Sequence, residues 1–109
     1  ILTTDDYANE TYVELRNAAG VVVWSEGNEN VSGNFGTGAF PAPNDATNPL
    51  QNNTVYNYDI PLTAFECYTF VIYDDWGDGG GPISVTSGDT VIYSSAGGYG
   101  ASDSAAFTL

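Results

Sequence analysis

Short apolar runs alternate along the chain with turns rich in Gly, Asn and Asp, and no segment sustains a helical period. Runs with the length and the β-branched and aromatic content of strands cover residues 11–16, 21–24, 54–62, 67–73, 82–87, 90–95 and 105–109. The opening residues 1–4, ILTT, have the same character. Ser87, Gly88 and Asp89 predict a tight hairpin turn between two of the runs.

This pattern predicts an all-β fold, an antiparallel, jelly-roll-like β-sandwich with negligible helix. The 109 residues, of which 42% are hydrophobic, suit one sandwich domain spanning residues 1–109. Residues 27–53 form a long stretch rich in Asn, Gly and Pro with few core candidates. That stretch is either a functional surface loop or a set of short irregular strands packed on the sandwich.

The charge balance narrows the range of partners. Fourteen acidic residues and a single basic one, Arg16, give a net charge of -13. Nucleic acids and anionic membranes would need clustered Lys or Arg, so we expect neither, and no apolar run is long enough for membrane insertion. Cations are the expected charged partners. The near absence of trypsin sites and the abundance of Asn, Thr, Ser and Gly indicate an extracellular chain, secreted or on a cell surface.

Cysteine and histidine usage excludes several kinds of site. Cys67 is the only cysteine, so an internal disulfide is impossible. The apolar sequence around it, ECYTFVIY, favours a role as a small buried hydrophobic residue. The alternatives are that Cys67 forms an intermolecular disulfide or is a reactive thiol. Because the chain has no His, Ser-His and Cys-His catalysis and the usual zinc sites are excluded.

Two acidic segments suggest a calcium site. DDWGDG, from Asp74, is an incomplete match to the calcium-loop pattern D-x-[DN]-x-[DN]-G, with Trp76 where a ligand would stand. The segment TTDDYANE holds the other dense group of carboxylates. If strand 11–16 runs beside strand 67–73, the two groups meet at one end of the sandwich. The predicted metal ligands are Asp5, Glu10, Asp74 and Asp78, with Asp6 and Asp75 ranked below them.

The alternative for the second segment is an Asp/Gly turn whose aspartates cap backbone amides. Five carboxylates crowded together without a cation would repel one another and raise some of their pKa values. Convergence of the two segments therefore favours a metal.

Three motifs carry a resemblance to a known domain: TTDDYANET near the start, CYTFVIYDDWGDGGGPISV in the middle and GGYGASDSAAFTL at the end. The chain resembles a β-sandwich domain of secreted and cell-surface proteins, notably of gliding, outer-membrane-bearing bacteria. The resemblance covers roughly the first 25 and last 45 residues and implies a bound calcium. Asp5, Glu10, Asp74 and Asp78 stand at its acidic positions, with Gly77 and Gly79 at its glycines. It implies no enzymatic activity. The cysteines that often follow its G-D-G are absent here.

Glycosylation signals are also present. Asn9, Asn30 and Asn52 begin N-linked sequons, although chance accounts for any single match. Ser104 and Thr90 lie in short D-[ST]-apolar sequences that resemble the O-linked signal of the same bacterial group.

Three functional classes compete. An enzyme is disfavoured, because so short a chain without His leaves little room for a cleft beside its Asp/Gly turns. A carbohydrate-binding module is the alternative, with Trp24, Trp76, Tyr7, Tyr93 and Tyr99 as stacking platforms, although core packing suits most of them. We expect a non-enzymatic, calcium-stabilised structural or adhesive module that self-associates as the repeating subunit of a filament.

Overall fold

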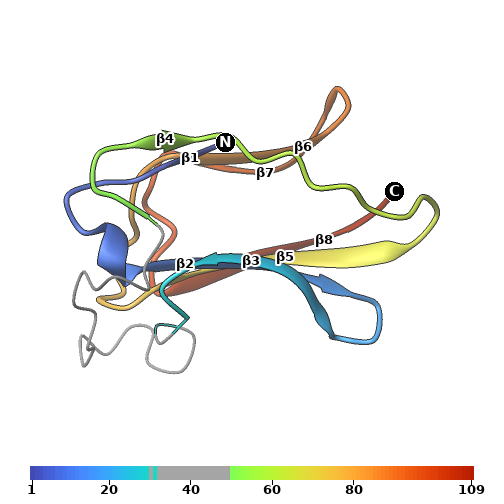
Figure 1. The fold of residues 1–109 in the computed structure, drawn as a ribbon, viewed down its shortest axis with the longest axis horizontal. Coiled ribbons are helices and arrows are strands. Elements are labelled where there is room, and N and C mark those ends of the chain that lie inside the picture. Colours follow the sequence, from blue (N-terminus) through green and yellow to red (C-terminus); the bar gives the residue numbers. More distant parts are fainter. Residues whose placement is uncertain (30, 32–49) are drawn as a thin grey trace.

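The fold is a sandwich of two four-stranded antiparallel sheets (Figure 1). A computed structural model describes residues 1–29, 31 and 50–109. The first sheet has the order β4 (Val55–Tyr56), β1 (Leu2–Thr3), β6 (Ile83–Ser87) and β7 (Thr90–Ser95). The second has the order β3 (Val22–Gly27), β2 (Thr11–Asn17), β5 (Cys67–Asp74) and β8 (Ser102–Thr108). η1 (Ala8–Glu10) is a single 3-10 turn, and the described residues contain no α-helix, so the predicted all-β sandwich is confirmed.

The second sheet is the more regular layer. β2 pairs with β5 along its whole length, from Thr11 opposite Asp74 to Asn17 opposite Tyr68, and β8 pairs with the other edge of β5. Strand alternation then directs Phe70 and Ile72 of β5 toward the first sheet. The buried core comes from both sheets and their connections: Leu2, Ala8, Val13, Leu15, Leu50, Phe70, Ile72, Ile83 and Tyr99. Full burial of each large apolar side chain contributes about 1.5–3 kcal/mol.

The predicted strand over residues 54–62 is wrong for most of its length. Only Val55–Tyr56 pairs, with Thr3 and Leu2 of β1. β1 is two residues long, so it offers no further ladder partner, and Pro61 has no N–H to donate. Residues 57–62 consequently run on outside any strand. Most of the predicted loop region 27–53 lies outside the described residues.

The interpretation of Cys67 as a buried hydrophobe is also wrong. Cys67 is exposed, because it is the first residue of β5 and lies on the outward face of the second sheet. Its Sγ is 3.4 Å from Oγ1 of Thr108 on the paired strand β8. An intermolecular disulfide and a reactive thiol stay as predictions.

The hairpin between β6 and β7 is confirmed. Ser87 pairs with Thr90, which leaves Gly88 and Asp89 as a two-residue turn, and Gly88 takes the positive φ of 57° that such turns need. None of the described residues forms a helix long and apolar enough to cross a membrane.

Candidate metal centre

The pairing of β2 with β5 brings the two acidic segments together. Thr11 and Asp74 are opposite each other at one end of this ladder. Glu10, at the end of η1, immediately precedes Thr11, and its carbonyl oxygen accepts a hydrogen bond of 3.0 Å from the N–H of Asp75. The start of one strand and the end of the other are therefore fixed side by side, so the strand pairing on which the predicted site depended is present.

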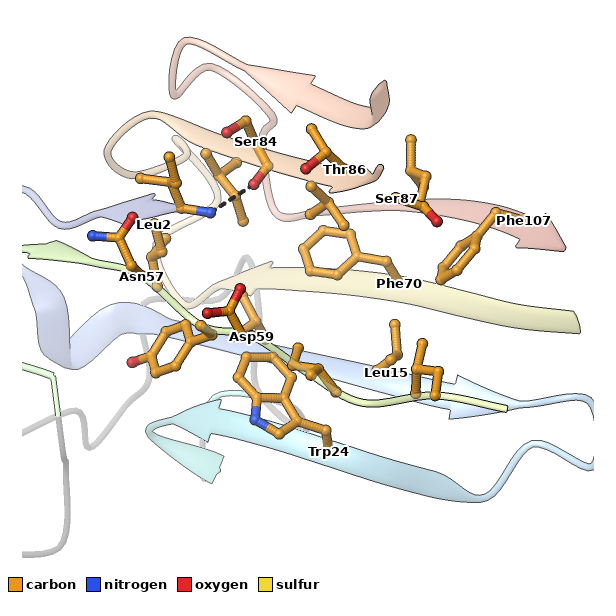
Figure 2. A pocket seen from close by; sticks show the side chains of 18 of the residues that line it. Leu2, Leu15, Trp24, Asn57, Asp59, Phe70, Ser84, Thr86, Ser87 and Phe107 are labelled. Atoms are coloured by element: carbon orange, nitrogen blue, oxygen red, sulfur yellow. Dashed lines mark hydrogen bonds between the residues drawn. The ribbon is translucent and has the colours of Figure 1, made fainter. Parts of the chain in front are cut away.

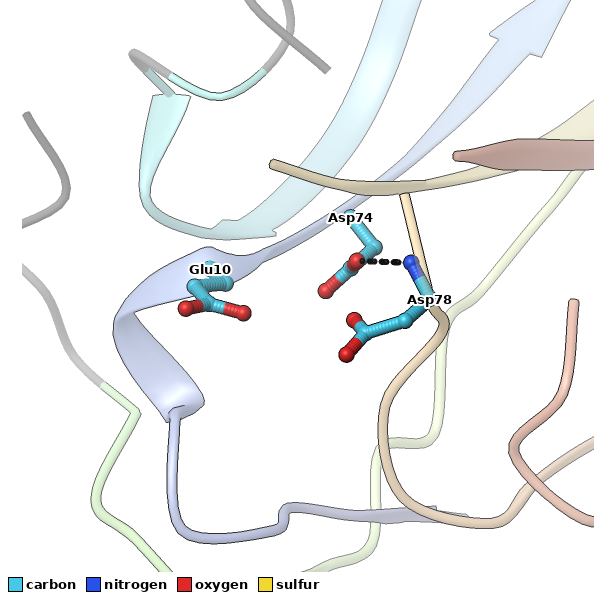
Figure 3. Close-up of side chains that lie close together, drawn as sticks. All are labelled: Glu10, Asp74 and Asp78. Carbon is cyan, nitrogen blue, oxygen red and sulfur yellow. Dashed lines mark hydrogen bonds between the residues drawn. The ribbon is translucent and has the colours of Figure 1, made fainter. Parts of the chain in front are cut away.

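Three carboxylates converge at this end of the sandwich (Figure 3). Glu10, Asp74 and Asp78 each offer one carboxylate oxygen, and these oxygens lie within 4.8 Å of one another. Asp74 is only 1% exposed and Glu10 is buried, whereas Asp78 is exposed. The group, called the acidic cluster below, thus has a buried inner pair and a solvent-accessible third member.

Asp74 also caps the loop that follows it. One of its carboxylate oxygens, Oδ2, accepts hydrogen bonds from the N–H groups of Asp78, at 3.0 Å, and Gly79, at 3.2 Å. The turn-capping alternative is therefore realised as well, and it coexists with the cluster. Capping fixes the loop so that the carboxyl group of Asp78 returns toward those of Asp74 and Glu10 (Figure 3).

The glycines of this loop are required by close packing. Gly79 has a φ of +85°, and a Cβ at this position would collide with the carbonyl oxygen of Gly97. A Cβ at Gly81 would collide with the carbonyl oxygen of Thr3. The loop can therefore lie against two neighbouring backbones only because it lacks side chains at these points.

The electrostatics of the acidic cluster are unfavourable without a cation. Burial, followed by the negative charges of Asp74 and Asp78, raises the pKa of Glu10 to about 7. Burial and the contact with the carboxyl group of Asp78 raise the pKa of Asp74 to about 7. Arg16, the only basic residue of the chain, is paired with Glu14 instead. A bound cation would supply the missing counter-charge.

The other predicted ligands occupy different positions. Asp5 accepts a 2.8 Å hydrogen bond from the N–H of Tyr7, and its charge still contributes to the raised pKa of Glu10. Asp6 accepts a 2.8 Å bond from the side-chain amide of Asn53. Asp75 is fully buried, and burial raises its pKa. Of the six candidates, the structure gathers Glu10, Asp74 and Asp78 into one group.

Tyr99 was missed as a neighbour of the site. Its hydroxyl oxygen lies 2.6 Å from the position that a Cβ on Gly80 would occupy, so the buried phenol packs against the acidic loop. Burial, followed by the charge of Asp74, raises the pKa of Tyr99. The only sequence signal was the run of glycines around it, which allows close backbone packing.

The predicted aromatic platforms divide into two groups. Trp24, Tyr93 and Tyr99 pack in or against the core, as expected for most of them. Tyr7 and Trp76 are 60% and 61% exposed, and both belong to the segments that carry the acidic cluster.

The glycosylation candidates lie in different settings. Asn52 is exposed, and its side-chain oxygen accepts a 2.9 Å hydrogen bond from the N–H of Ala8. Asn9 is half-buried within η1, and Asn30 lies outside the described residues. Ser104 and Thr90 are exposed.

A cavity of about 730 Å³ lies between the two sheets, and none of the carboxylates of the acidic cluster lines it.

In comparisons with known proteins, no family model, no curated protein and no solved structure matches this chain. The functional argument therefore rests on the geometry of the acidic cluster and of the sheets.

Proposed function

We propose that this chain is a non-enzymatic extracellular module that is stabilised by calcium and serves as a structural or adhesive repeating subunit of a filament. The observation that carries the proposal is the convergence of Glu10, Asp74 and Asp78 within 4.8 Å in a chain whose only basic residue is paired elsewhere. A bound cation would join the start of β2 to the loop after β5, and so would stiffen one end of the sandwich.

Calcium suits this donor set best. Carboxylates are hard oxygen ligands, and three of them offer at most six oxygens, the lower limit of the six to eight that calcium takes. Backbone carbonyls and water can supply the rest. Magnesium demands a tighter octahedron and releases its water reluctantly, so a partly exposed group of carboxylates that leaves room for carbonyl and water ligands favours the larger ion. The resemblance to the calcium-binding sandwich domain supports the same assignment.

Isothermal titration calorimetry tests the ion. The chain, stripped of metal with a chelator, should bind calcium with a stoichiometry of one and bind magnesium at least tenfold more weakly. No heat with either ion would refute the metal site. Equal affinities would refute the assignment to calcium.

The case for a structural, extracellular role rests on surface chemistry. Val21, Val22 and Val23 are exposed on or next to the edge strand β3, and the chain contains no Lys, the residue that most often blunts such edges. The excess of carboxylates would also let divalent cations bridge copies once salt of about 0.1 M screens the net charge of -13. None of the three carboxylates lines the cavity, so the cavity and the acidic cluster do not combine into a substrate cleft, which agrees with a non-enzymatic role.

A carbohydrate-binding module is the second candidate, and one observation favours it. Trp76 is exposed between two residues of the acidic cluster, and Tyr7 is exposed just before η1. Aromatic faces beside a calcium site can stack on sugar rings. A glycan array probed in calcium and in chelator distinguishes the candidates. Calcium-dependent binding that disappears in Trp76→Ala, while the chain stays monomeric, would favour the sugar-binding module.

A further inference from the structure

Hydroxyl groups lie on the inner side of the acidic cluster, the side that faces the first sheet. Thr11 and Asp74 are opposite each other in the β2–β5 ladder, so their side chains share one face, with Cβ atoms about 4.5–5.5 Å apart. Phe70 is four residues before Asp74 on β5, so it shares that face, and it borders the cavity between the sheets (Figure 2). Thr11 and Asp74 are both buried. The hydroxyl group of Thr11 is therefore a neighbour of the Asp74 carboxylate inside the sandwich.

Tyr99 reaches the same place from the connection between β7 and β8, and it is 9% exposed. Its hydroxyl oxygen lies 2.6 Å, and Oγ1 of Thr11 lies 3.3 Å, from the position that a Cβ on Gly80 would occupy. Gly79, the residue before Gly80, donates its N–H to Oδ2 of Asp74. The two hydroxyl groups therefore meet beside the loop that Asp74 caps.

The phenol of Tyr99 lacks a hydrogen-bond partner there. Its hydroxyl oxygen is buried and makes no hydrogen bond to any residue that the structure describes. A buried hydroxyl without a partner is destabilising, and native structures keep few of them. After burial, the charge of Asp74 is the next cause of the raised pKa of Tyr99, so the phenol lies within electrostatic range of the acidic cluster.

An ion in the acidic cluster would need a further ligand on this inner side. Oδ2 of Asp74 already accepts two backbone hydrogen bonds, so the three carboxylates keep at most five oxygens for an ion, fewer than the six to eight that calcium takes. Asp78 is exposed, so solvent reaches the outer side of the cluster. The inner side is lined by the buried residues Thr11 and Tyr99. A ligand on that side must be held by buried groups.

We propose that the hydroxyl group of Tyr99, together with that of Thr11, holds a buried water molecule that ligates the ion on the inner side of the acidic cluster. A water bound to a cation has two O–H groups to donate, and a phenol oxygen accepts one of them. The O–H of Tyr99 is then free to donate to Oγ1 of Thr11. The phenol gains a partner, and the ion gains a ligand.

Tyr99 is thus a positioning residue that acts through the water. The usual protein ligands of calcium are carboxylates, carbonyls and water, so direct coordination by a neutral phenol is disfavoured. A role in packing alone would not need the hydroxyl group. Phenylalanine would bury the same ring without an unpaired polar atom.

This inference rests on the proposed calcium site and adds a residue to it. A chain that binds no calcium would refute both. Calcium binding that does not depend on the hydroxyl group of Tyr99 would refute only the role given to Tyr99.

The first test measures calcium affinity in Tyr99→Phe by titration calorimetry. Affinity should fall by about tenfold, the lower end of the usual effect of removing an outer partner of a metal ligand. Tyr93→Phe is the matched control, because the hydroxyl of Tyr93 bonds to Asp103, 3.1 Å away, and its loss should leave the affinity unchanged. Equal affinities of Tyr99→Phe and the unmodified chain would overturn the proposal.

Thermal unfolding separates this role from packing. In chelator, Tyr99→Phe should be at least as stable as the unmodified chain, because it removes a buried hydroxyl that has no partner among the described residues. In calcium the same variant should be the less stable of the two. A loss of melting temperature that is equal in calcium and in chelator would indicate packing alone and would overturn the proposal.

A crystal structure of the calcium-loaded chain is the third test and needs no variant, so it decides if Tyr99→Phe does not fold. It should show a water that ligates the ion and lies within hydrogen-bond distance of Oη of Tyr99. A bound ion whose ligands include no such water would overturn the proposal.

Discussion

Thr11 and Asp74 are opposite each other at the end of the β2–β5 ladder, and this one pairing determines the position of the acidic cluster. It sets Glu10 beside the loop that begins at Asp75, and the capping bonds of Asp74 bring Asp78 back to the same point. A cation bound here would join two segments more than sixty residues apart in the sequence. The first three predictions below follow from that arrangement.

Calcium should raise the melting temperature through Asp78. An ion present at a hundredfold excess over its dissociation constant adds about 2.7 kcal/mol, which corresponds to roughly 10–20 °C for a domain of this size. Asp78→Asn should remove most of this increase, because it deletes one charged ligand from the acidic cluster. Asp89→Asn, in the turn between β6 and β7, is the matched control and should keep it. Differential scanning calorimetry in calcium and in chelator provides the measurement. A chelator effect of equal size in both variants would exclude Asp78 as a ligand.

Without metal, stability should fall as pH rises from about 4 to 8. The folded pKa values of Glu10 and Asp74 are about 7, above their usual values of 4.5 and 3.8, so the folded state binds more protons than the unfolded state in this range. The stabilisation by protonation is complete below the unfolded values and is lost as pH passes about 7. Saturating calcium should weaken or reverse this slope, because the ion binds the deprotonated carboxylates.

Melting temperatures measured at several pH values in chelator test this slope. Glu10→Gln should flatten the profile, whereas Glu66→Gln, at an exposed position before β5, should not. A metal-free protein whose stability rises with pH would contradict the prediction.

Gly79→Ala should destabilise the chain by about 1–3 kcal/mol and weaken calcium binding. The added methyl group would collide with the carbonyl oxygen of Gly97, and the φ of +85° is strained for any residue with a Cβ. Gly98→Ala is the matched control, since a Cβ there meets no atom within 4 Å. Urea unfolding in calcium and in chelator measures both effects. Equal stabilities of the two variants would mean that the loop can shift without cost.

The sequence predicted the sandwich because strand alternation in β2 and β5 is a local property of the chain. The sequence also pointed to Glu10, Asp74 and Asp78, since dense groups of acidic residues next to predicted strands are visible without coordinates. The roles of Asp5 and Asp6 could not be predicted in this way. Whether each carboxylate turns toward the acidic cluster or bonds to Tyr7 or Asn53 depends on side-chain geometry.

The early end of β4 could not be predicted from the sequence either. Residues 54–62 have the composition of a strand, but a strand forms only where a neighbour supplies hydrogen bonds, and β1 is too short to supply them. The exposure of Cys67 depends on register, because a shift of one residue exchanges the two faces of β5. The local sequence pattern therefore predicted where strands form. The pairing between strands determined where each strand ends and which of its faces is buried.

Asn52 should carry an N-linked glycan. The residue is exposed beside the first sheet, where a bulky sugar displaces no core side chain, whereas Asn9 is half-buried in η1. Mass spectrometry of native material should find the glycan on the peptide that contains Asn52, and a protease other than trypsin is needed because Arg16 is the only basic residue. A bare polypeptide mass would contradict this prediction, and a glycan at Asn9 alone would show that burial does not govern the choice of site.

The chain should form elongated assemblies in millimolar calcium that shorten on chelation. At low ionic strength the net charge of -13 opposes association. At an ionic strength of about 0.1 M or more the Debye length falls to about 10 Å or less, and calcium both screens and bridges carboxylates. The exposed valines at the edge of β3 then become available for contacts between copies. Light scattering and electron microscopy should therefore show fibres.

Val23→Lys should suppress them by placing a charge on that edge, while Ser94→Lys, an exposed change of equal charge on β7, should not. Persistent monomers of the unmodified chain at high concentration would refute the filament and favour the sugar-binding module.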